Sequence, residues 1–322
     1  MNRDEANLVS VIIPVYNDAE RLKHCLQALQ QQTYRQEHYE VIVIDNNSEE
    51  DIAAVVQNYS QVRVVKEPMR GSYAARNSGI SHAQGEILAF TDADCIPDPT
   101  WIERGTECLL ALDRPGLIAG EIKIFFKQPD QPTAPELYDS LTNLQQKKIA
   151  EQAHFAATAN LFTFKQVFDE IGLFNPQLKS GGDSEWGKRA FSQGYPVVYA
   201  TDACVAHPAR DSMAQLYKKV ARVRSGFYQL ESVGQQQRQQ SLLRQFLNVA
   251  YRWKPPLLYA FKRSFLEPRL KGYFKKLQIF AIVILVHYRG VYEVTKLMLK
   301  KISKQASYYV EDENLTYHSR KI

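Results

Sequence analysis

Two aspartates, Asp92 and Asp94, follow the short apolar run Ile87 to Phe90 and are separated from each other only by Ala93. Carboxylate oxygens at the rigid end of a buried strand suit a hard divalent cation such as Mg²⁺ or Mn²⁺. Such a cation can bridge the two phosphates of a diphosphate. Two aspartates at this spacing occur by chance about once in a chain of this size. A strand-end turn with solvated acids is therefore the alternative.

Polar clusters also follow the two earlier apolar runs of the chain. Val9 to Val15 is followed by Tyr16-Asn17, and Tyr39 to Ile44 is followed by Asp45-Asn46-Asn47. A near-continuous apolar run is typical of a parallel strand that is covered on both faces. In sheets built from repeated β-α units, ligands bind beyond the carboxyl ends of the strands. The three clusters are therefore expected to meet at one edge of a sheet.

The spacing of apolar residues predicts the elements that hold these clusters. Alternating strands and helices over the first 130 residues predict an α/β fold, with a doubly wound, mostly parallel sheet and helices on both faces. Asp18 is expected to cap the first helix. In chain order we expect the strand Val9 to Val15, a helix through Leu22 to Leu29, the strand Tyr39 to Ile44, a polar helix, the strand Val62 to Val65, the helix Ser72 to Ala83, the strand Ile87 to Phe90, the helix Trp101 to Leu112, the strand Leu117 to Phe126, the helix Glu136 to Gln152, the extended segment Ala156 to Phe164, and the helices Gln166 to Ile171 and Ser184 to Gln193.

The composition is that of an ordinary globular protein, with 322 residues of which 45% are hydrophobic and 23% charged. It excludes disordered, collagen-like and coiled-coil proteins. The chain has no G-x-G-x-x-G or P-loop motif, no H-E-x-x-H zinc motif and no G-x-S-x-G nucleophile elbow. Its four cysteines form no C-x-x-C pair, so we expect free thiols in a reducing compartment. The acidic start, Met1 to Glu5, favours a cytoplasmic protein over a secreted one.

The positive charge is concentrated in the C-terminal part, which is expected to be helical after His207, with a glutamine-rich linker or helix end from Gly234 to Gln240. The formal net charge is +5, but Tyr251 to Gln305 alone carries thirteen basic and two acidic residues. The apolar run Leu277 to Val286 inside it is shorter than the roughly 20 residues that cross a bilayer. It can lie in the headgroup plane of an anionic membrane. A buried helix or strand is an equal alternative, and nucleic acid is not expected because no known binding motif accompanies the basic residues.

Several stretches, taken together and in order, resemble the family 2 glycosyltransferases with the GT-A fold. The resemblance covers roughly residues 9–210. It implies an enzyme that transfers a sugar with inversion from a nucleotide-sugar donor and uses a divalent metal, Mn²⁺ or Mg²⁺. The matching stretches are Val9 to Asn17, Leu26 to Tyr34, Glu40 to Ser48, Gly71 to Gly79, Phe90 to Cys95, Ala159 to Phe162 and Gly182 to Arg189.

The resemblance also implies roles for single residues around the donor. Asp45 would contact the nucleoside, with a turn-forming acid as the alternative. Asp92 would lie near the ribose, and Asp94 would bind the metal that holds the diphosphate. Arg76 matches a basic residue that the family places near the nucleotide; a surface ion pair on its own helix is the alternative. The first loop would be shaped by Pro14, Tyr16 and Asn17, with Tyr16 available to stack on the base.

Asp183 is the general base that the resemblance implies. It matches the second member of an acidic pair whose first member is here Gly182, which departs from the family pattern. An aspartate before Ser184 is also a natural helix N-cap. Both roles are compatible, because the helix start would keep the carboxylate ionised at neutral pH. His207 lies where many relatives carry a histidine near the metal and would ligate it beside Asp94; a structural histidine is the alternative.

The sequence therefore predicts an inverting glycosyltransferase that moves a sugar from a nucleotide-diphosphate sugar, with a UDP-sugar favoured, to an acceptor hydroxyl. Residues 1–210 would form the catalytic domain, with a nucleotide-binding half near 1–125 and an acceptor half near 126–210. Residues 211–322 would form a basic helical extension, in contact with the inner face of the membrane through residues 251–305. A glycan or lipid-linked acceptor, in cell-surface polysaccharide or glycolipid synthesis, would fit this organisation.

Three other functions are weighed against this prediction. A nucleotidyltransferase would carry a glycine-rich basic loop after the first strand, and Pro14 to Asp18 offers none. A non-catalytic scaffold at the membrane is disfavoured because every expected acid except the first of the pair is present. A processive synthase would carry a Q-x-x-R-W signature, but Arg252-Trp253 is preceded by Val249 at the glutamine position.

Overall fold

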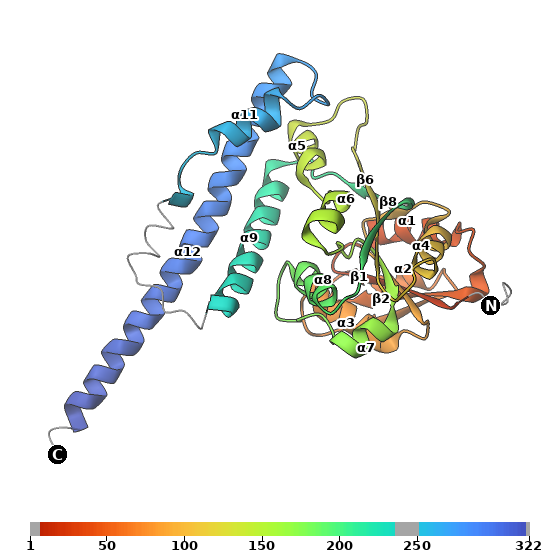
Figure 1. Ribbon diagram of the computed structural model, residues 1–322, viewed down its shortest axis with the longest axis horizontal. Coiled ribbons are helices and arrows are strands. Elements are labelled where there is room, and N and C mark those ends of the chain that lie inside the picture. The colour runs from red at the N-terminus through yellow and green to blue at the C-terminus, as the bar shows by residue number, and fades with distance from the viewer. Residues whose placement is uncertain (1–6, 236–250, 320–322) are drawn as a thin grey trace. The chain divides into compact units, whose positions relative to one another are not determined.

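The computed structural model describes residues 7–235 and 251–319, and the chain divides into two compact units, Met1–Asp211 and Ser212–Ile322 (Figure 1). The first unit carries the sheet, and the described part of the second is helical. The acidic start, Met1 to Glu5, and residues 236–240 of the glutamine-rich stretch lie outside the described residues.

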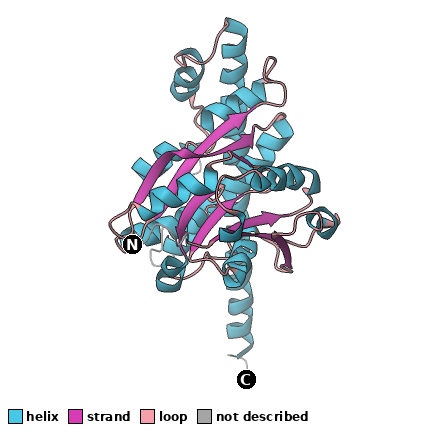
Figure 2. Ribbon diagram, turned by 90° about the vertical axis from the view of Figure 1, so that its right-hand side faces the viewer, coloured by secondary structure: helices cyan, strands magenta, loops and turns pink. Residues whose placement is uncertain are grey.

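The first unit is built on an eight-stranded sheet in the order β3-β2-β1-β4-β7-β6-β8-β5. Strands of this sheet are drawn as magenta arrows in Figure 2. The pairs β1-β2, β1-β4, β2-β3 and β6-β8 are parallel. The pairs β4-β7, β6-β7 and β5-β8 are antiparallel. The expected α/β sheet is confirmed, and its second half is mixed. The strands are β1 (Val9–Val15), β2 (Tyr39–Asp45), β3 (Val62–Lys66), β4 (Ile87–Thr91), β5 (Ile96–Pro97), β6 (Leu117–Phe125), β7 (Asn160–Phe164) and β8 (Val197–Pro208).

Helices cover both faces of this sheet, as the sequence predicts (Figure 2). They are α1 (Ala19–Gln30), α2 (Ile52–Val56), α3 (Ser72–His82), α4 (Trp101–Leu110), α5 (Ala134–Thr142), α6 (Gln146–Lys148), α7 (Lys165–Ile171) and α8 (Gly182–Ser192), with the short turns η1 (Gln36–His38) and η2 (Ile149–Ala153). All four cysteines are free, and Cys25, Cys95 and Cys204 are buried, which confirms the expected free thiols.

The close packing of α3 on β1 fixes the helix that carries Arg76. Val11 and Ile12 of β1 are both fully buried, so that strand is covered on both of its faces. A Cβ at Gly79 of α3 would lie 2.5 Å from the side chain of Ile12. The helix can approach the sheet this closely because a glycine has no side chain at that position.

Two strands and several helix boundaries differ from the sequence-based expectations. The strands β5 and β8 were not predicted. The expected helix Glu136 to Gln152 is interrupted after Thr142, because Leu144 has a positive φ of 43°. Asp18 does not cap α1 with its side chain; its carboxylate binds Arg21 instead. The expected extended segment from Ala156 becomes a strand only at Asn160.

The buried side chain of Asn160 holds the second half of the sheet together. Its Nδ2 donates to the backbone oxygens of Glu121 and Ala203, at 2.8 and 2.9 Å. Its Oδ1 accepts a hydrogen bond of 2.9 Å from the indole nitrogen of Trp101. The pairing of β6 with β8 shifts register between Gly120 and Glu121, beside this amide. Asn160 thereby satisfies backbone groups that the irregular pairing leaves free.

The second unit contains α9 (Met213–Gln235), α11 (Leu257–Phe265) and α12 (Tyr273–Ser319), and α12 packs against both other helices. The apolar run Leu277 to Val286 is part of α12, and Ile279 and Val283 within it are buried. Among the described residues, the segment Tyr273–Lys300 is a helix of 28 residues that is long and apolar enough to cross a membrane, by length and composition only. The sequence analysis judged the run Leu277 to Val286 too short to cross a bilayer. That run is only part of the helix, and the helical segment Tyr273–Lys300 is not too short.

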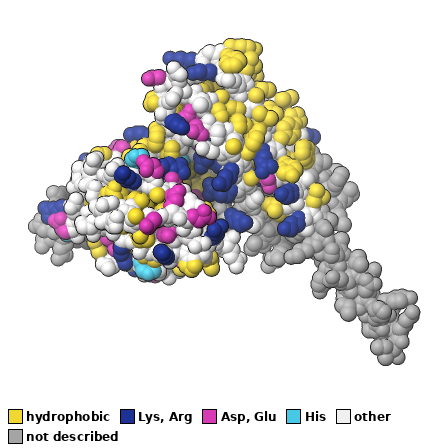
Figure 3. Space-filling view, turned by 180° about the vertical axis from the view of Figure 1, so that it is seen from behind, with side chains coloured by type: hydrophobic (Ala, Val, Ile, Leu, Met, Phe, Trp, Pro, Cys, Tyr) yellow, Lys and Arg dark blue, Asp and Glu magenta, His cyan; other side chains and the backbone are white. Residues whose placement is uncertain are grey.

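Exposed apolar side chains lie among basic ones on α11 and the start of α12, and Figure 3 shows this mixture of hydrophobic and basic side chains on the face it presents. The largest exposed fractions belong to Phe274 (73%), Tyr273 (71%) and Leu258 (68%). A helix surface with exposed aromatic and leucine side chains next to lysines is typical of segments that lie in a membrane interface.

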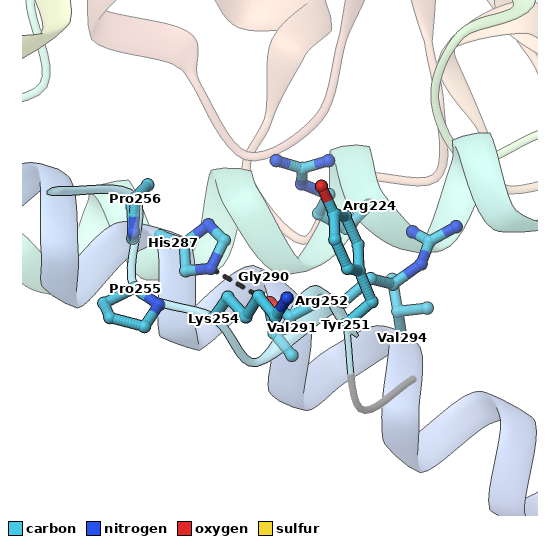
Figure 4. A pocket seen from close by; sticks show the side chains of 10 residues that line it. All are labelled: Arg224, Tyr251, Arg252, Lys254, Pro255, Pro256, His287, Gly290, Val291 and Val294. Carbon is cyan, nitrogen blue, oxygen red and sulfur yellow. Dashed lines mark hydrogen bonds between the residues drawn. The ribbon is translucent and has the colours of Figure 1, made fainter. Parts of the chain in front are cut away.

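A cavity of about 370 Å³ lies within the second unit, between α9, α12 and the segment before α11 (Figure 4). Arg224, Arg252, Lys254 and His287 line it, and no acidic residue does among those described. The His287 ring lies 3.1 Å from the backbone oxygen of Arg252. Such a lining gives the cavity a positive potential that favours anions.

Candidate active site

The carboxyl ends of β1, β2 and β4 lie next to one another in the sheet, so the three polar clusters meet at one edge, as the sequence predicts. Val15 pairs with Asp45 in the register of β1 and β2, and the amide of Asn46 donates to the backbone oxygen of Val15 at 2.9 Å. Asp92 and Asp94 follow β4 on the other side of β1. Parallel pairing thus brings together residues that are 30 to 80 positions apart.

Hydrogen bonds join the loop after β1 to the loop after β2. The amide of Asn17 donates to Ser48 Oγ at 3.1 Å, and Asn17 Oδ1 accepts from the amide of Glu49 at 2.7 Å. Asp45 is buried, and its Oδ1 accepts from the amide of Ser48 at 2.9 Å. Asn17 and Asn47 have positive φ values of 49° and 66°, a backbone conformation that asparagine tolerates better than most residues. Asp45 therefore forms the turn that was the alternative to a nucleoside contact, and the two roles are compatible.

Tyr16 and Pro14 occupy different positions relative to the first loop. Tyr16 is 46% exposed, and the guanidinium of Arg70 lies 5.3 Å from the centre of its ring. The ring is therefore exposed at this edge of the sheet, and stacking on a base stays a prediction. Pro14 lies inside β1, opposite Ile44 of β2, and not in the loop itself. The expectation that Pro14 shapes the loop is corrected: it belongs to the strand that leads into it.

Arg76 is buried, and it is not part of a surface ion pair on its own helix. Only 4% of the residue is exposed, and its Nη2 forms a short ion pair with Asp92 Oδ1. Its guanidinium also lies 5.8 Å from the centre of the Tyr73 ring. A buried guanidinium needs a charged partner because desolvation is costly. Arg76 therefore ties the first turn of α3 to the loop after β4.

Asp183 lies in the first turn of α8 and contacts this same turn of α3. Tyr73 Oη donates to Asp183 Oδ1 at 3.2 Å, and the amide of Ser184 donates to the same oxygen at 2.9 Å. The N-cap of α8 is Gly181, in the left-handed conformation, so the expected N-cap role of Asp183 is wrong. The helix begins two residues earlier than expected, which places Asp183 inside its first turn.

Burial raises the pKa of Asp183 above its ordinary value, and it outweighs the groups that act in the opposite direction. The Ser184 amide, the Arg76 guanidinium and the Tyr73 hydroxyl all lower this pKa, while the charge of Asp92 raises it. We expected the helix start to favour the ionised form of Asp183. In the structure the effect of burial is larger, and it favours the protonated form. A carboxylate with a raised pKa is a stronger base once it is ionised.

Asp94 and His207 come together because β5 pairs with β8. Ile96 lies opposite Ala206 in this pairing, so the residues next to them are close in space. His207 Nε2 lies 3.8 Å from Asp94 Oδ1. The ring Nδ1 lies 2.8 Å from the backbone oxygen of Pro208, which can only accept, so Nδ1 is the donor, and the neutral ring then has its lone pair on Nε2. This tautomer is the one that ligates a metal through Nε2.

Cys95 completes a group of three potential metal ligands with Asp94 and His207, whose ligand atoms all lie within 4.8 Å of one another. Burial, together with the charges of Asp92 and Asp94, raises the pKa of Cys95 well above its ordinary value. Its thiol therefore stays neutral, and its Sγ donates to the backbone oxygen of Ala159 at 3.9 Å. Beside it, the Asp94 carboxylate offers an oxygen ligand of the kind that Mn²⁺ and Mg²⁺ prefer, and the His207 imidazole offers a nitrogen ligand.

Comparison with known proteins identifies the family. A family model described as Glycosyl transferase family 2 matches residues 10–172, half of the chain. Glycosyltransferase AglE of Haloferax volcanii is 41% identical over 227 residues, which cover 69% of this chain and 73% of AglE. The chain belongs to glycosyl transferase family 2. This confirms the resemblance found in the sequence and makes the protein a glycosyltransferase with a role in glycan synthesis.

One further relative of this family 2 glycosyltransferase and one solved structure are less similar. The dolichyl N-acetyl-alpha-D-glucosaminyl phosphate 3-beta-D-2,3-diacetamido-2,3-dideoxy-beta-D-glucuronosyltransferase of Methanococcus voltae is 21% identical over 226 residues, 66% of this chain and 70% of that protein. The solved structure of mannosyltransferase PcManGT from Pyrobaculum calidifontis, in complex with GDP-Man and Mn²⁺, has a TM-score of 0.55 at 16% identity and covers 97% of this chain and 81% of that one. The second likeness shows the fold alone, which is the GT-A fold. Family membership favours glycosyl transfer over the nucleotidyltransferase and scaffold alternatives.

Sequence reasoning missed two residues that contact the predicted site residues, Arg21 and Tyr73. Arg21 Nη1 lies 3.4 Å from Asp94 Oδ2, and its Nε donates to Asp18 at 2.6 Å. The spacing of Asp18 and Arg21 on a helix was a visible signal for their pair. Neither the contact with Asp94 nor the contact of Tyr73 with Asp183 has a local signal, because each spans more than 70 residues.

We expect Asp183→Asn to leave the free energy of unfolding at pH 7 unchanged or to raise it. Folding raises the pKa of Asp183, so the folded chain binds this proton more tightly than the unfolded chain, whose value is near 3.8. Ionisation therefore costs stability as the pH rises through the folded pKa, and an asparagine avoids this cost while its Oδ1 still accepts both hydrogen bonds. Below the unfolded pKa the two proteins should be equally stable.

Chemical unfolding at pH 7 and near pH 3.5 measures this difference. Asp139→Asn is the matched control, because Asp139 is fully buried and accepts from Arg210 at 3.1 Å. Loss of that buried pair should destabilise the protein by about 3–5 kcal/mol. A clearly lower stability of Asp183→Asn at pH 7 would contradict the prediction.

Proposed function

We propose that this glycosyltransferase is inverting and transfers a sugar from a nucleotide-diphosphate sugar to an acceptor hydroxyl by metal-assisted direct displacement. The observation that carries the proposal is the chain of contacts from Asp92 through Arg76 and Tyr73 to Asp183. It links the sheet edge expected for the donor to the carboxylate expected for the base. A reaction between donor and acceptor requires both functions within one site.

The donor is a UDP-sugar in this proposal. Asp45 and Asp92 contact the nucleoside and the ribose, and Tyr16 stacks on the base. Asn17 supports the loop that carries Tyr16, Pro14 lies in the strand that leads into this loop, and Arg76 orients Asp92. The burial of Arg76 and the 46% exposure of Tyr16 support this division between a framework residue and a contact residue. Preformed loops of this kind lower the entropy lost on binding.

Asp94 and His207 hold the divalent metal, Mn²⁺ or Mg²⁺, in this proposal. The carboxylate and the free Nε2 of the imidazole fit such an ion, and the Nδ1 contact with Pro208 fixes the ring orientation. When bound, the ion supplies positive charge that stabilises the departing diphosphate. Arg21, whose Nη1 lies 3.4 Å from Asp94 Oδ2, helps to hold that carboxylate in place.

Asp183 is the general base. The acceptor oxygen forms a bond to the anomeric carbon while the bond from that carbon to the phosphate oxygen breaks, and the acceptor's proton passes to Asp183. Attack opposite to the leaving nucleoside diphosphate inverts the configuration. The raised pKa of Asp183 favours this proton transfer, since a base works best when its pKa approaches the working pH.

The second unit brings the enzyme to the inner face of a membrane, where its acceptor is a glycan or a lipid-linked sugar in cell-surface polysaccharide or glycolipid synthesis. The exposed apolar side chains of α11 and early α12 support this, as does the basic cavity beside α12. The relative from Methanococcus voltae is named for a dolichyl N-acetyl-glucosaminyl phosphate. Basic residues near a lipid surface each add about 1 kcal/mol of attraction to anionic headgroups.

Asp183→Asn should retain donor binding but lose transfer by about 10²- to 10⁴-fold in kcat, because the amide cannot accept the proton. A thermal-shift screen of nucleotide sugars with Mn²⁺ selects the donor, and release of the labelled nucleotide measures turnover. Asp113→Asn, which alters an exposed carboxylate, is the control. Wild-type turnover in Asp183→Asn would remove Asp183 from the mechanism.

Asp94→Ala and His207→Ala should each weaken Mn²⁺-dependent binding of the nucleotide diphosphate by at least about tenfold, because each removes one ligand of the metal. Calorimetric titration of UDP with and without Mn²⁺ measures this difference. Asp98→Ala is a nearby control, since the Asp98 carboxylate pairs with Lys123 at 3.8 Å. Equal Mn²⁺ dependence in all three variants and the wild type would reject the metal assignment.

Leu258→Asp should reduce sedimentation of the full chain with anionic vesicles at least about fivefold, because it places a charge on the exposed apolar face of α11. Leu110→Asp, at a 48% exposed leucine of α4 in the first unit, is the matched control. Vesicles of zwitterionic lipid should bind the wild type weakly. Equal sedimentation of Leu258→Asp and the wild type would discard membrane contact through α11.

A further inference from the structure

The ring of Tyr73 occupies the space in which a side chain at position 182 would lie. A Cβ built on Gly182 would come within 2.7 Å of Tyr73 Cε2 and 2.8 Å of Cδ2 and Cζ. Contacts this short are not found between real side chains, so either the ring or the added group must move. The glycine at the start of α8 and the tyrosine at the start of α3 are therefore structurally coupled.

The ring has little freedom to move away. Tyr73 is 5% exposed, and its ring centre lies 5.7 Å from that of Phe174. Phe174 in turn packs on Trp186 of α8, with ring centres 5.2 Å apart. The guanidinium of Arg76 also lies 5.8 Å from the centre of the Tyr73 ring. A ring enclosed in this way holds its hydroxyl at one position relative to α8.

The hydroxyl of Tyr73 is directed at one oxygen of Asp183. Tyr73 Oη and the Ser184 amide both donate to Oδ1, and no hydrogen bond from the described residues reaches Oδ2. Burial and the charge of Asp183 raise the pKa of Tyr73 above its ordinary value, so the phenol keeps its proton at neutral pH. The carboxylate is thus anchored through Oδ1, and Oδ2 is left for a substrate.

We propose that Tyr73 is a positioning residue that takes the place of a side chain at position 182 and orients the Asp183 carboxylate so that Oδ2 meets the acceptor hydroxyl. This inference rests on the proposed role of Asp183 as general base. Tyr73 acts through Asp183 and does not itself touch the reacting atoms. Its ring also explains why position 182 carries no side chain.

Tyr73→Phe is the decisive variant, because it keeps the ring and removes only the hydroxyl. We expect kcat to fall about tenfold, as for the loss of a hydrogen bond to a charged group, with the KM values of donor and acceptor within about twofold of the wild type. The hydroxyl lowers the pKa of Asp183, so its removal should raise that pKa and move the acid limb of the kcat profile to higher pH. The charges that face Asp183 in this profile are those of Arg76 and Asp92.

Tyr34→Phe is the matched control, since it removes a tyrosine hydroxyl that donates to the backbone oxygen of Asn7 at 2.7 Å, remote from Asp183 in the chain. It should leave kcat and the pH profile unchanged. A merely structural role of the Tyr73 hydroxyl would lower stability without moving the acid limb. An unchanged acid limb together with wild-type kcat in Tyr73→Phe overturns the inference.

Gly182→Ala tests the steric half of the proposal independently of the hydroxyl. The added methyl group should displace the Tyr73 ring and lower kcat, and this loss should shrink in a Tyr73→Ala background, where the space is free. A double-mutant cycle measures that coupling; additive losses would count against the proposal. Asp183→Asn distinguishes failure of the proposed function from failure of the Tyr73 inference. If Asp183→Asn retains transfer, the proposed function fails. If Asp183→Asn is inactive while Tyr73→Phe behaves like the wild type, only the role of Tyr73 is rejected.

Discussion

The ion pair between the buried Arg76 and the partly exposed Asp92 is the interaction on which the geometry of the candidate site depends. A guanidinium that is 4% exposed is stable only with a charged partner, so Asp92 must stay beside it. The same turn of α3 carries Tyr73, which contacts Asp183 at the start of α8. One helical turn thus connects the loop after β4 to a residue 90 positions later in the chain. The close approach of α3 to β1 at Gly79 keeps that turn in place.

The first half of the fold was predictable because its signals are local. Buried parallel strands need runs such as Val9 to Val15 and Tyr39 to Ile44, and these runs stand out in the sequence. The strand β8 gave no such signal, because its burial alternates irregularly and Thr201 and Asp202 interrupt it where the pairing with β6 shifts register. β5 has only two residues. Its existence depends on pairing with β8, which lies about 110 residues away.

The candidate site was also predictable only in part. The residue types and the meeting of three clusters followed from the sequence, since strand ends of a parallel sheet share an edge. The partner of each side chain did not follow. Arg76 pairs with Asp92 and not with its own helix, and His207 reaches Asp94 only through the β5-β8 pairing. For Asp183 the local rule for N-caps failed because Gly181 adopts the left-handed conformation and starts the helix earlier.

The ionised form of Asp183 is needed for its proposed role as a base, but it lowers the stability of the folded protein. An isolated helix start would stabilise its charge, but the surrounding burial raises its pKa and makes the ionised form costly. Its hydrogen-bond donors, Tyr73 and the Ser184 amide, offset part of that cost through a single oxygen. More donors would lower the cost further and would also weaken the carboxylate as a base. A carboxylate held by two donors on one oxygen, with the other oxygen free, is the arrangement in which folding tolerates the charge and the charge can still accept a proton.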